Sequence, residues 1–232
     1  MVMNIKYIGH STFLLSIDKN KILTDPFFNN KSFGKYKRLV PSCCDVTTIP
    51  KIDTILISHE HSDSFDVEAT NYLVKKYSPK VIAHRSVLNN IDTSEYNKIP
   101  IDEYETKNIN NISYTAYPAH HPHSFYPLSF LIKSKDNKSV FFAGDTFMTK
   151  DHDKIKPNIA ILPIGGKNTM DIGSAIRISK KMVPEYIIPM HYNTFEYIKK
   201  NPHELKYKFE KTRYDIKTKV LEPGKTFKYS WF

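Results

Sequence analysis

Short apolar runs alternate with longer segments in which apolar residues recur every three to four positions. The short runs predict strands over residues 5–8, 12–17, 21–24, 54–57, 80–83, 112–117, 128–133, 140–143, 159–163 and 186–188. The longer spacing predicts helices over 67–77 and 171–183, and the second helix places on one side Ile172, Ala175, Ile176, Ser179 and Val183. Strands come first, strands and helices then alternate, and this sequence of elements occurs twice. The order is typical of an α/β protein.

The chain shows no internal boundary. It has 232 residues and no linker, repeat or low-complexity tract, so we expect one domain over residues 1–232. No run approaches the ~20 consecutive apolar residues of a membrane span. The first 16 residues also lack the basic start, apolar centre and cleavage site of a signal peptide. We therefore expect a cytoplasmic protein without a transmembrane segment.

Charge and cysteine content narrow the function classes. The net charge of +10 permits attraction to an anionic small molecule, a membrane surface or nucleic acid. The lysines are scattered and form no block, however, and a solvated lysine-rich surface is the simpler interpretation. The two cysteines, Cys43 and Cys44, are adjacent and poorly placed for an ordinary disulfide. This excludes a secreted domain held together by disulfides.

Five of the predicted strands end in loops that carry histidine, aspartate or paired glycine. The loops contain His59-Glu60-His61-Ser62-Asp63, His120-His121, Gly144-Asp145, Gly165-Gly166 and His191. Open α/β sheets place their ligands beyond the carboxyl ends of the strands, so these loops are expected to meet at one site. Three of the seven glycines lie in these loops, where the backbone needs conformations or close approaches that other residues resist.

The spacing of His59, His61 and Asp63 is typical of a metal-binding loop. Residues two apart in a tight loop can direct both imidazoles at one ion, and the carboxylate can reach a water or a second ion. Imidazoles and carboxylates from the other loops complete a ligand set that suits zinc, iron or manganese. The candidate metal ligands are His59, His61, Asp63, His121, Asp145 and His191.

Several of these residues also have a structural interpretation. Asp145 follows a glycine and could cap a turn, and His191 could be a hydrogen-bonded core histidine. His120 and His121 are neighbours, so we expect only one of them to be a ligand. The other histidines are His10, His84 and His123, whose roles stay open, and His152 and His203, which we expect at the surface.

Seven short motifs are spread over nearly the whole chain. They are Gly9-His10-Ser11, Thr24-Asp25-Pro26-Phe27, Ser58-His59-Glu60-His61-Ser62-Asp63, Pro118-Ala119-His120-His121, Gly144-Asp145-Thr146, Leu162-Pro163-Ile164-Gly165-Gly166 and Pro189-Met190-His191-Tyr192-Asn193-Thr194-Phe195. With them the chain resembles the metallo-β-lactamase superfamily, in particular the branch that contains N-acylphosphatidylethanolamine phospholipase D and L-ascorbate-6-phosphate lactonase. The resemblance implies an α/β fold of four layers, an αββα sandwich, with a metal centre in a cleft at one edge of its two sheets.

The resemblance also implies a division of the ligands between two ions. By position, the first ion is held by His59, His61 and His121, the second by Asp63 and His191, and both by a bridging Asp145. Zinc is the expected metal, with manganese or iron as alternatives.

One ligand of the family pattern is missing. The pattern is His-x-His-x-Asp-His, and Ser64 stands where the last histidine belongs. A neutral hydroxyl is a poorer zinc ligand than imidazole. We therefore expect one tightly bound ion and a second site that is weaker or empty, with a possible preference there for manganese. Asp66 or His84 could fill the gap, depending on where their side chains point.

The resemblance implies a metal-dependent hydrolase that uses metal-activated water and is of the phosphodiesterase or lactonase type. Asp63 is expected to orient the water and accept its proton, and His191 or Tyr192 to steady the developing negative charge. The substrate is expected to be a small, anionic phosphodiester or a lactone or other ester. The loop over 27–50 could select the substrate or simply pack against the core.

Two other functions remain open. Loss of the sixth ligand could have left a non-catalytic protein that binds or senses a metal. A nuclease is a less favoured alternative, because no basic stripe interleaved with aromatic residues is present and nucleic acid is therefore not expected as a partner.

Overall fold

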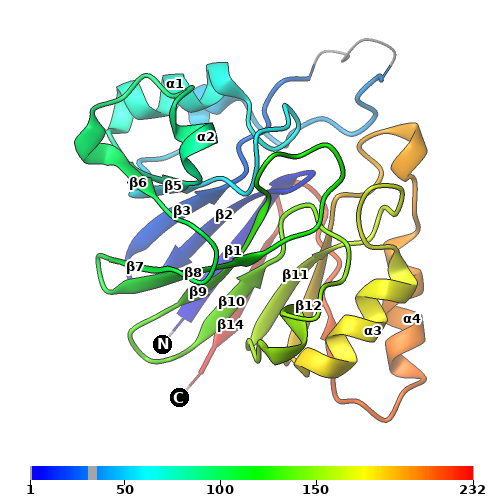
Figure 1. Ribbon diagram of the computed structural model, residues 1–232. Coiled ribbons are helices and arrows are strands. Elements are labelled where there is room, and N and C mark those ends of the chain that lie inside the picture. The colour runs from blue at the N-terminus through cyan, green and yellow to red at the C-terminus, as the bar shows by residue number, and fades with distance from the viewer. Residues whose placement is uncertain (1, 31–35, 232) are drawn as a thin grey trace.

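The computed structural model describes residues 2–30 and 36–231, which form two seven-stranded sheets packed face to face (Figure 1). The first sheet has the order β14-β1-β2-β3-β4-β5-β6. Its strands are β1 (Val2–Gly9), β2 (Thr12–Ile17), β3 (Asn20–Thr24), β4 (Thr54–Leu56), β5 (Lys80–Ala83), β6 (Lys98–Pro100) and β14 (Thr226–Ser230). The second sheet has the order β13-β12-β11-β10-β9-β8-β7. Its strands are β7 (Thr106–Ile109), β8 (Ile112–Pro118), β9 (Leu128–Lys133), β10 (Ser139–Phe142), β11 (Ile159–Pro163), β12 (Tyr186–Met190) and β13 (Lys217–Thr218).

Helices cover the outer faces of both sheets (Figure 1). Helices α1 (Val67–Tyr77) and α2 (Arg85–Leu88) lie on the first sheet, and α3 (Ile172–Met182) and α4 (Pro202–Glu210) lie on the second. Single turns of 3₁₀ helix occur at η1 (Val46–Thr48), η2 (Glu95–Asn97), η3 (His152–Lys154) and η4 (Glu196–Ile198). The expected four-layer αββα sandwich is therefore confirmed.

The two-residue period of the strands explains how one sheet packs on two sides. In β4, Ile55 faces the apolar cluster under α1, while the next residue, Leu56, faces the core between the sheets. In β8 the residues that point into this central core are Ile112, Tyr114 and Ala116, and their neighbours are partly exposed. Strands buried on both faces therefore read as continuous apolar runs in the sequence.

Helices α1 and α3 begin and end on local signals. The side chains of Asp66 and Asp171 accept hydrogen bonds from backbone N–H groups in the first turn of α1 and α3. Each helix ends at a residue with a positive φ, Ser78 or Val183. The expected buried side of the second helix is partly wrong, because Val183 leaves the helical path and is 56% exposed. Ile178 and Met182 are buried in α3, and Ile176 is only partly buried.

His152 was expected at the surface and is instead fully buried. It lies in η3 with its ring against the edge of Phe141, 5.2 Å between ring centroids. Burial lowers the pKa of His152 to about 4, so the ring is neutral near pH 7. His203 is exposed on α4, as expected.

The parallel strands of both sheets fix where the loops emerge. Strands β3 to β6 run parallel in the first sheet, and β10 to β13 run parallel in the second. The loops that follow these strands therefore leave from one end of each sheet, which is where ligands bind in open α/β sheets.

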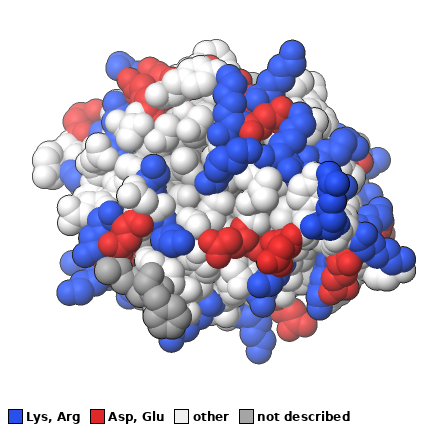
Figure 2. Space-filling model, turned by 90° about the horizontal axis from the view of Figure 1, so that it is seen from below, with Lys and Arg blue, Asp and Glu red and all other residues white. Residues whose placement is uncertain are grey.

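The surface carries its positive charge in a dispersed form. Figure 2 shows Lys and Arg side chains spread over the face seen from below, with Asp and Glu side chains between them. Within the described residues, none of the helices has the length and apolar character needed to cross a membrane.

Candidate metal centre

The loops after β1, β4, β8, β10 and β12 meet where the two sheets adjoin. They bring together two groups of side chains, and within each group the candidate ligand atoms lie within 4.8 Å of one another. The first group is His59, His61 and His121, and the second is His10, Asp63, Asp145 and His191. The structure thus gathers all six side chains selected from the sequence, and it adds His10.

The first group consists of three imidazoles that face one another. Nδ1 of His61 and Nε2 of His121 are 2.9 Å apart, and the three ring centroids are 4.7 to 4.8 Å apart. Nε2 of His59 is buried and has no hydrogen-bond partner among the described residues. Ring nitrogens that converge in this way, one of them without any partner, fit a transition-metal ion.

Two further ring nitrogens of this group, one on His59 and one on His121, are held by hydrogen bonds. Nδ1 of His59 lies 2.9 Å from Oγ of Ser58, which in turn donates to Asp25 at 2.6 Å. Nδ1 of His121 lies 3.0 Å from the carbonyl oxygen of Asn168, to which it donates. Such partners fix the ring and leave the opposite nitrogen with a free lone pair.

Burial sets the charge of these groups. It lowers the pKa of His59 to about 4 and also lowers the pKa of His121, which keeps both rings neutral and able to bind a metal. Burial raises the pKa of Asp25, although its two hydrogen bonds from Ser58 oppose this. An anionic Asp25 is therefore favoured by a nearby cation.

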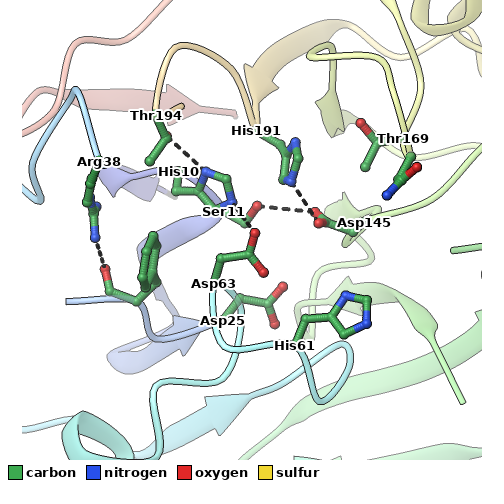
Figure 3. Close-up of polar contacts among 12 residues, drawn as sticks. His10, Ser11, Asp25, Arg38, His61, Asp63, Asp145, Thr169, His191 and Thr194 are labelled. Atoms are coloured by element: carbon green, nitrogen blue, oxygen red, sulfur yellow. Dashed lines mark hydrogen bonds and ion pairs between the residues drawn. The ribbon is translucent and has the colours of Figure 1, made fainter. Parts of the chain in front are cut away.

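The second group pairs two carboxylates with two imidazoles. Nε2 of His191 lies 2.8 Å from Oδ2 of Asp145, and Nε2 of His10 lies 3.5 Å from Oδ2 of Asp63 (Figure 3). Burial raises the pKa of Asp63 and Asp145, but the adjacent imidazoles outweigh it and the pKa of both carboxyls is lowered. Burial likewise lowers the pKa of His191, but the charge of Asp145 outweighs it and the pKa is raised.

The two residues considered as substitutes for the missing histidine are engaged elsewhere. The Asp66 carboxylate caps α1 and also accepts hydrogen bonds from the backbone N–H groups of residues 28 and 29. His84 caps α2 through Nδ1 and stacks on Tyr126, with 3.9 Å between ring centroids. Ser64 itself is fully buried.

Two glycines permit close approaches in the site loops. Gly144 has φ +60°, and a Cβ there would lie 2.7 Å from Cβ of Ser58, which holds His59. A Cβ on Gly165 would lie 2.3 Å from the carbonyl oxygen of His191. A side chain at either position would therefore displace a loop that carries a candidate ligand.

A cavity of about 120 Å³ opens over both groups. Candidate ligands line its floor, and its rim includes His123, Lys167, Asn168 and Tyr197. His120 is exposed beside Phe147, in keeping with the expectation that only one of the neighbouring histidines is a ligand. Tyr192 is directed elsewhere, since its hydroxyl donates to the carbonyl oxygen of Leu221.

The loop over 27–50 both packs and borders the site. Phe27 and Phe28 are buried, and Phe27 packs in a cluster with Phe195 and residue 198. Tyr36 is 44% exposed, and its ring centroid lies 5.0 Å from that of Tyr197, which lines the cavity. Phe33, another aromatic residue of this loop, lies outside the described residues.

Sequence reasoning left the role of His10 open and assigned none to Asp25 or Asn168. A signal for His10 was present, because it follows β1 directly, as His191 follows β12. Asp25 occurs in a motif, but its partner Ser58 is 33 positions away. Only the fold brings such pairs together.

Comparisons with known proteins agree with this architecture. Residues 4–191 match the beta-lactamase superfamily domain. A UPF0173 metal-dependent hydrolase of Nanoarchaeum equitans is 33% identical over 90% of this chain and 92% of its own length. A UPF0173 protein of Pyrococcus furiosus is 30% identical over 97% of this chain and 99% of its own.

Solved structures show the same fold. Igni18, a metallo hydrolase from Ignicoccus hospitalis, covers the whole chain and is itself covered completely, with a TM-score of 0.85 and 27% identity. An isothiocyanate hydrolase from Delia radicum gut bacteria has a TM-score of 0.80 at 17% identity, covering 98% of this chain and 99% of its own, which supports the fold alone. The chain therefore belongs to the beta-lactamase superfamily and, within it, to the UPF0173 family of metal-dependent hydrolases.

Proposed function

We propose that this protein hydrolyses a small anionic substrate, a phosphodiester or a lactone or other ester, with metal-activated water. The observation that carries the proposal is the convergence of side chains from five loops into two adjoining groups at the floor of one cavity. The volume of the cavity, about 120 Å³, suits a compact reacting group. Lys167 lines the cavity, and its positive charge suits an anionic one.

The metal binding has two parts in this proposal. His59, His61 and His121 hold the first and tighter ion, Asp63 and His191 hold a weaker second ion, and Asp145 contributes to both. Zinc is the preferred metal, since imidazole and carboxylate suit it, and manganese or iron are the alternatives. A bound divalent ion supplies Lewis acidity, which lowers the pKa of water to about 7 and polarises the oxygen under attack.

The chain's own residues position and protonate the reactants. Asp63 lines the cavity with a lowered pKa, so its carboxylate is ionised and can orient the attacking water and take its proton. His191 lines the cavity with a raised pKa, so when the second site holds no ion its imidazolium form can face negative charge that develops on the substrate.

The proposal also covers organisation and location. We treat residues 1–232 as one domain, and this is supported by a core cluster that extends from Met3 in β1 to Tyr229 in β14. We also propose a cytoplasmic location, with which the free thiols of Cys43 and Cys44 are compatible.

Hydrolysis assays on metal-loaded protein test the function. Zinc- or manganese-loaded wild type should hydrolyse bis(p-nitrophenyl) phosphate or a simple lactone, and His61→Ala should not. Asp63→Ala should lower kcat about 100-fold or more and keep the first ion, because it removes a general base. His84→Ala, a histidine outside the centre, serves as the control.

Each outcome decides between the candidate functions. Wild type that retains metal and hydrolyses neither substrate class contradicts the proposal and favours the metal-binding or sensing alternative. Unchanged turnover in Asp63→Ala excludes the role given to that carboxylate.

A further inference from the structure

We propose that His10 is a ligand of the second ion and replaces the histidine that the family pattern places at position 64. The inference rests on the proposed metal site and concerns one residue whose role the sequence analysis left open. It explains how the site can keep an imidazole where the chain has Ser64.

The position of the His10 ring is the first argument. Its Nε2 lies 3.5 Å from Oδ2 of Asp63, and its ring centroid is 4.3 Å from that of His191. One ligand atom from each of His10, Asp63, Asp145 and His191 lies within a single 4.8 Å set. Figure 3 shows the His10 ring between Thr194 and Asp63, with His191 beside it.

The second argument is an unpaired ring nitrogen. His10 is 1% exposed, and its Nε2 is buried without a hydrogen-bond partner among the described residues. A histidine that served only to fill the core between Phe27 and Phe195 would not need a ring nitrogen that lies 3.5 Å from the Asp63 carboxylate without a hydrogen bond. A cation at this place would satisfy the nitrogen and both carboxylates.

Thr194 sets the tautomer that a ligand requires. Its Oγ1 lies 2.9 Å from Nδ1 of His10 and donates its proton to the carbonyl oxygen of Tyr192 at 3.4 Å. The hydroxyl therefore accepts from Nδ1–H of His10, and the lone pair remains on Nε2. The same arrangement holds His121 of the first group through Asn168.

The backbone around His10 has two irregularities that orient its side chain. The pairing of β1 with β2 shifts register between Tyr7 and Gly9, and His10 adopts a left-handed φ of 57°. Irregularities of this kind re-aim side chains beside functional sites. His191 also has a left-handed φ, 52°, and its backbone N–H donates to the carbonyl oxygen of His10 at 3.0 Å, which ties the two loops together.

The variant His10→Asn tests the inference with little disturbance of the fold. Asparagine tolerates a left-handed backbone, and its amide can keep the hydrogen bond to Thr194 while Nε2 is removed.

The measurement is zinc and manganese binding by calorimetry, together with the metal content after dialysis. Wild type should bind two ions per chain. His10→Asn should keep the first ion unchanged and bind the second more than about 10-fold more weakly, because loss of outer partners alone already costs about 10- to 100-fold.

A rescue variant and a control make the test specific. Adding Ser64→His to His10→Asn should restore the second ion, since it returns the family's own ligand. His84→Asn, which changes a histidine outside the centre, should bind both ions as wild type does.

Three results would overturn the inference: a second ion bound equally well by His10→Asn, a wild type that binds only one ion at saturating metal, and a double variant that fails to recover the second ion. These readouts are independent of turnover. A protein that binds two ions through His10 but hydrolyses nothing supports the inference while contradicting the proposed function. A protein that binds no metal contradicts both.

Discussion

His59 and His121 of the first group are each anchored through Nδ1, which leaves Nε2 to face the other imidazoles. For His59 the anchor is a relay in which the ring donates to Ser58 and Ser58 donates to Asp25. The backbone N–H of Ser58 donates to the same carboxylate at 2.7 Å. Asp25 is therefore a positioning residue that acts on the metal site through two neighbours.

Replacing Asp25 with Asn should reverse this relay. An amide that donates to Ser58 forces the Ser58 hydroxyl to donate to His59, which moves the ring proton onto the nitrogen that faces the site. We expect Asp25→Asn to weaken zinc binding at the first site by about 10- to 100-fold. Competition with a zinc-binding dye measures this. Asp92→Asn, an exposed aspartate, is the control, and equal affinity in both variants would exclude the relay.

At this scale the sequence indicated six candidate ligands and left open the role of His10, whose partners are distant in the chain. His59, His61 and Asp63 share one loop, so their spacing alone predicts a common site. The neighbours of His10 come from the other end of the chain, since Thr194 is 184 positions away. The position of His10 directly after β1 was its only local signal, and that position does not reveal these partners.

Whether the sequence predicts a helix or strand depends on how much of that element is buried. Every predicted strand and both predicted helices occur, with small differences in their ends. Strands β6, β7 and β14 were not predicted, and their burial patterns show mostly partly buried or exposed positions. Strand β13 has only two residues. Such edge strands lack the apolar run or alternation that identifies a strand in a sequence.

The loop after β11 packs closely against the loop after β12 at Gly165. This close approach is possible because glycine has no side chain. Gly165→Ala should force His191 or η4 to move, because the added Cβ would meet the carbonyl oxygen of His191 at 2.3 Å and Cβ of Ile198 at 2.9 Å. We expect a loss of about 1–3 kcal/mol in the free energy of unfolding. Weaker binding of the second ion should accompany it.

Denaturant unfolding and metal titration check this, with Gly173→Ala in α3 as the matched control. A Cβ there meets nothing closer than 3.5 Å, and the change should be neutral or stabilise the helix by up to about 1 kcal/mol. If both variants have the same free energy of unfolding, the close approach at Gly165 does not contribute to stability.

On the scale of the whole molecule, both groups of candidate ligands draw side chains from both sheets. The first sheet supplies the residues after β1 and β4, and the second supplies those after β8, β10 and β12. Bound ions should therefore join the two sheets at this edge. The α/β class followed from the order of elements and the four-layer sandwich from the family resemblance, whereas the meeting of these particular loops depends on how the sheets face each other.

Removing metal should thus lower the stability of the entire molecule. Free metal at 100 times its Kd stabilises the native state by about 2.7 kcal/mol, which corresponds to a Tm difference of about 5–10 °C for a chain of this size. Thermal unfolding before and after treatment with a chelator measures the difference. The Tm of His61→Ala should respond much less, and an equal response would show that the chelator acts elsewhere.

Strand β1 gains one of its two neighbours, β14, from the opposite end of the chain, with Val2 opposite Ser230. While the protein is being synthesised, this edge of β1 stays open until the final strand leaves the ribosome. An open edge offers unpaired N–H and C=O groups to other chains and invites aggregation. Nascent chains therefore depend on fast completion or on chaperone shielding until residue 230 is released.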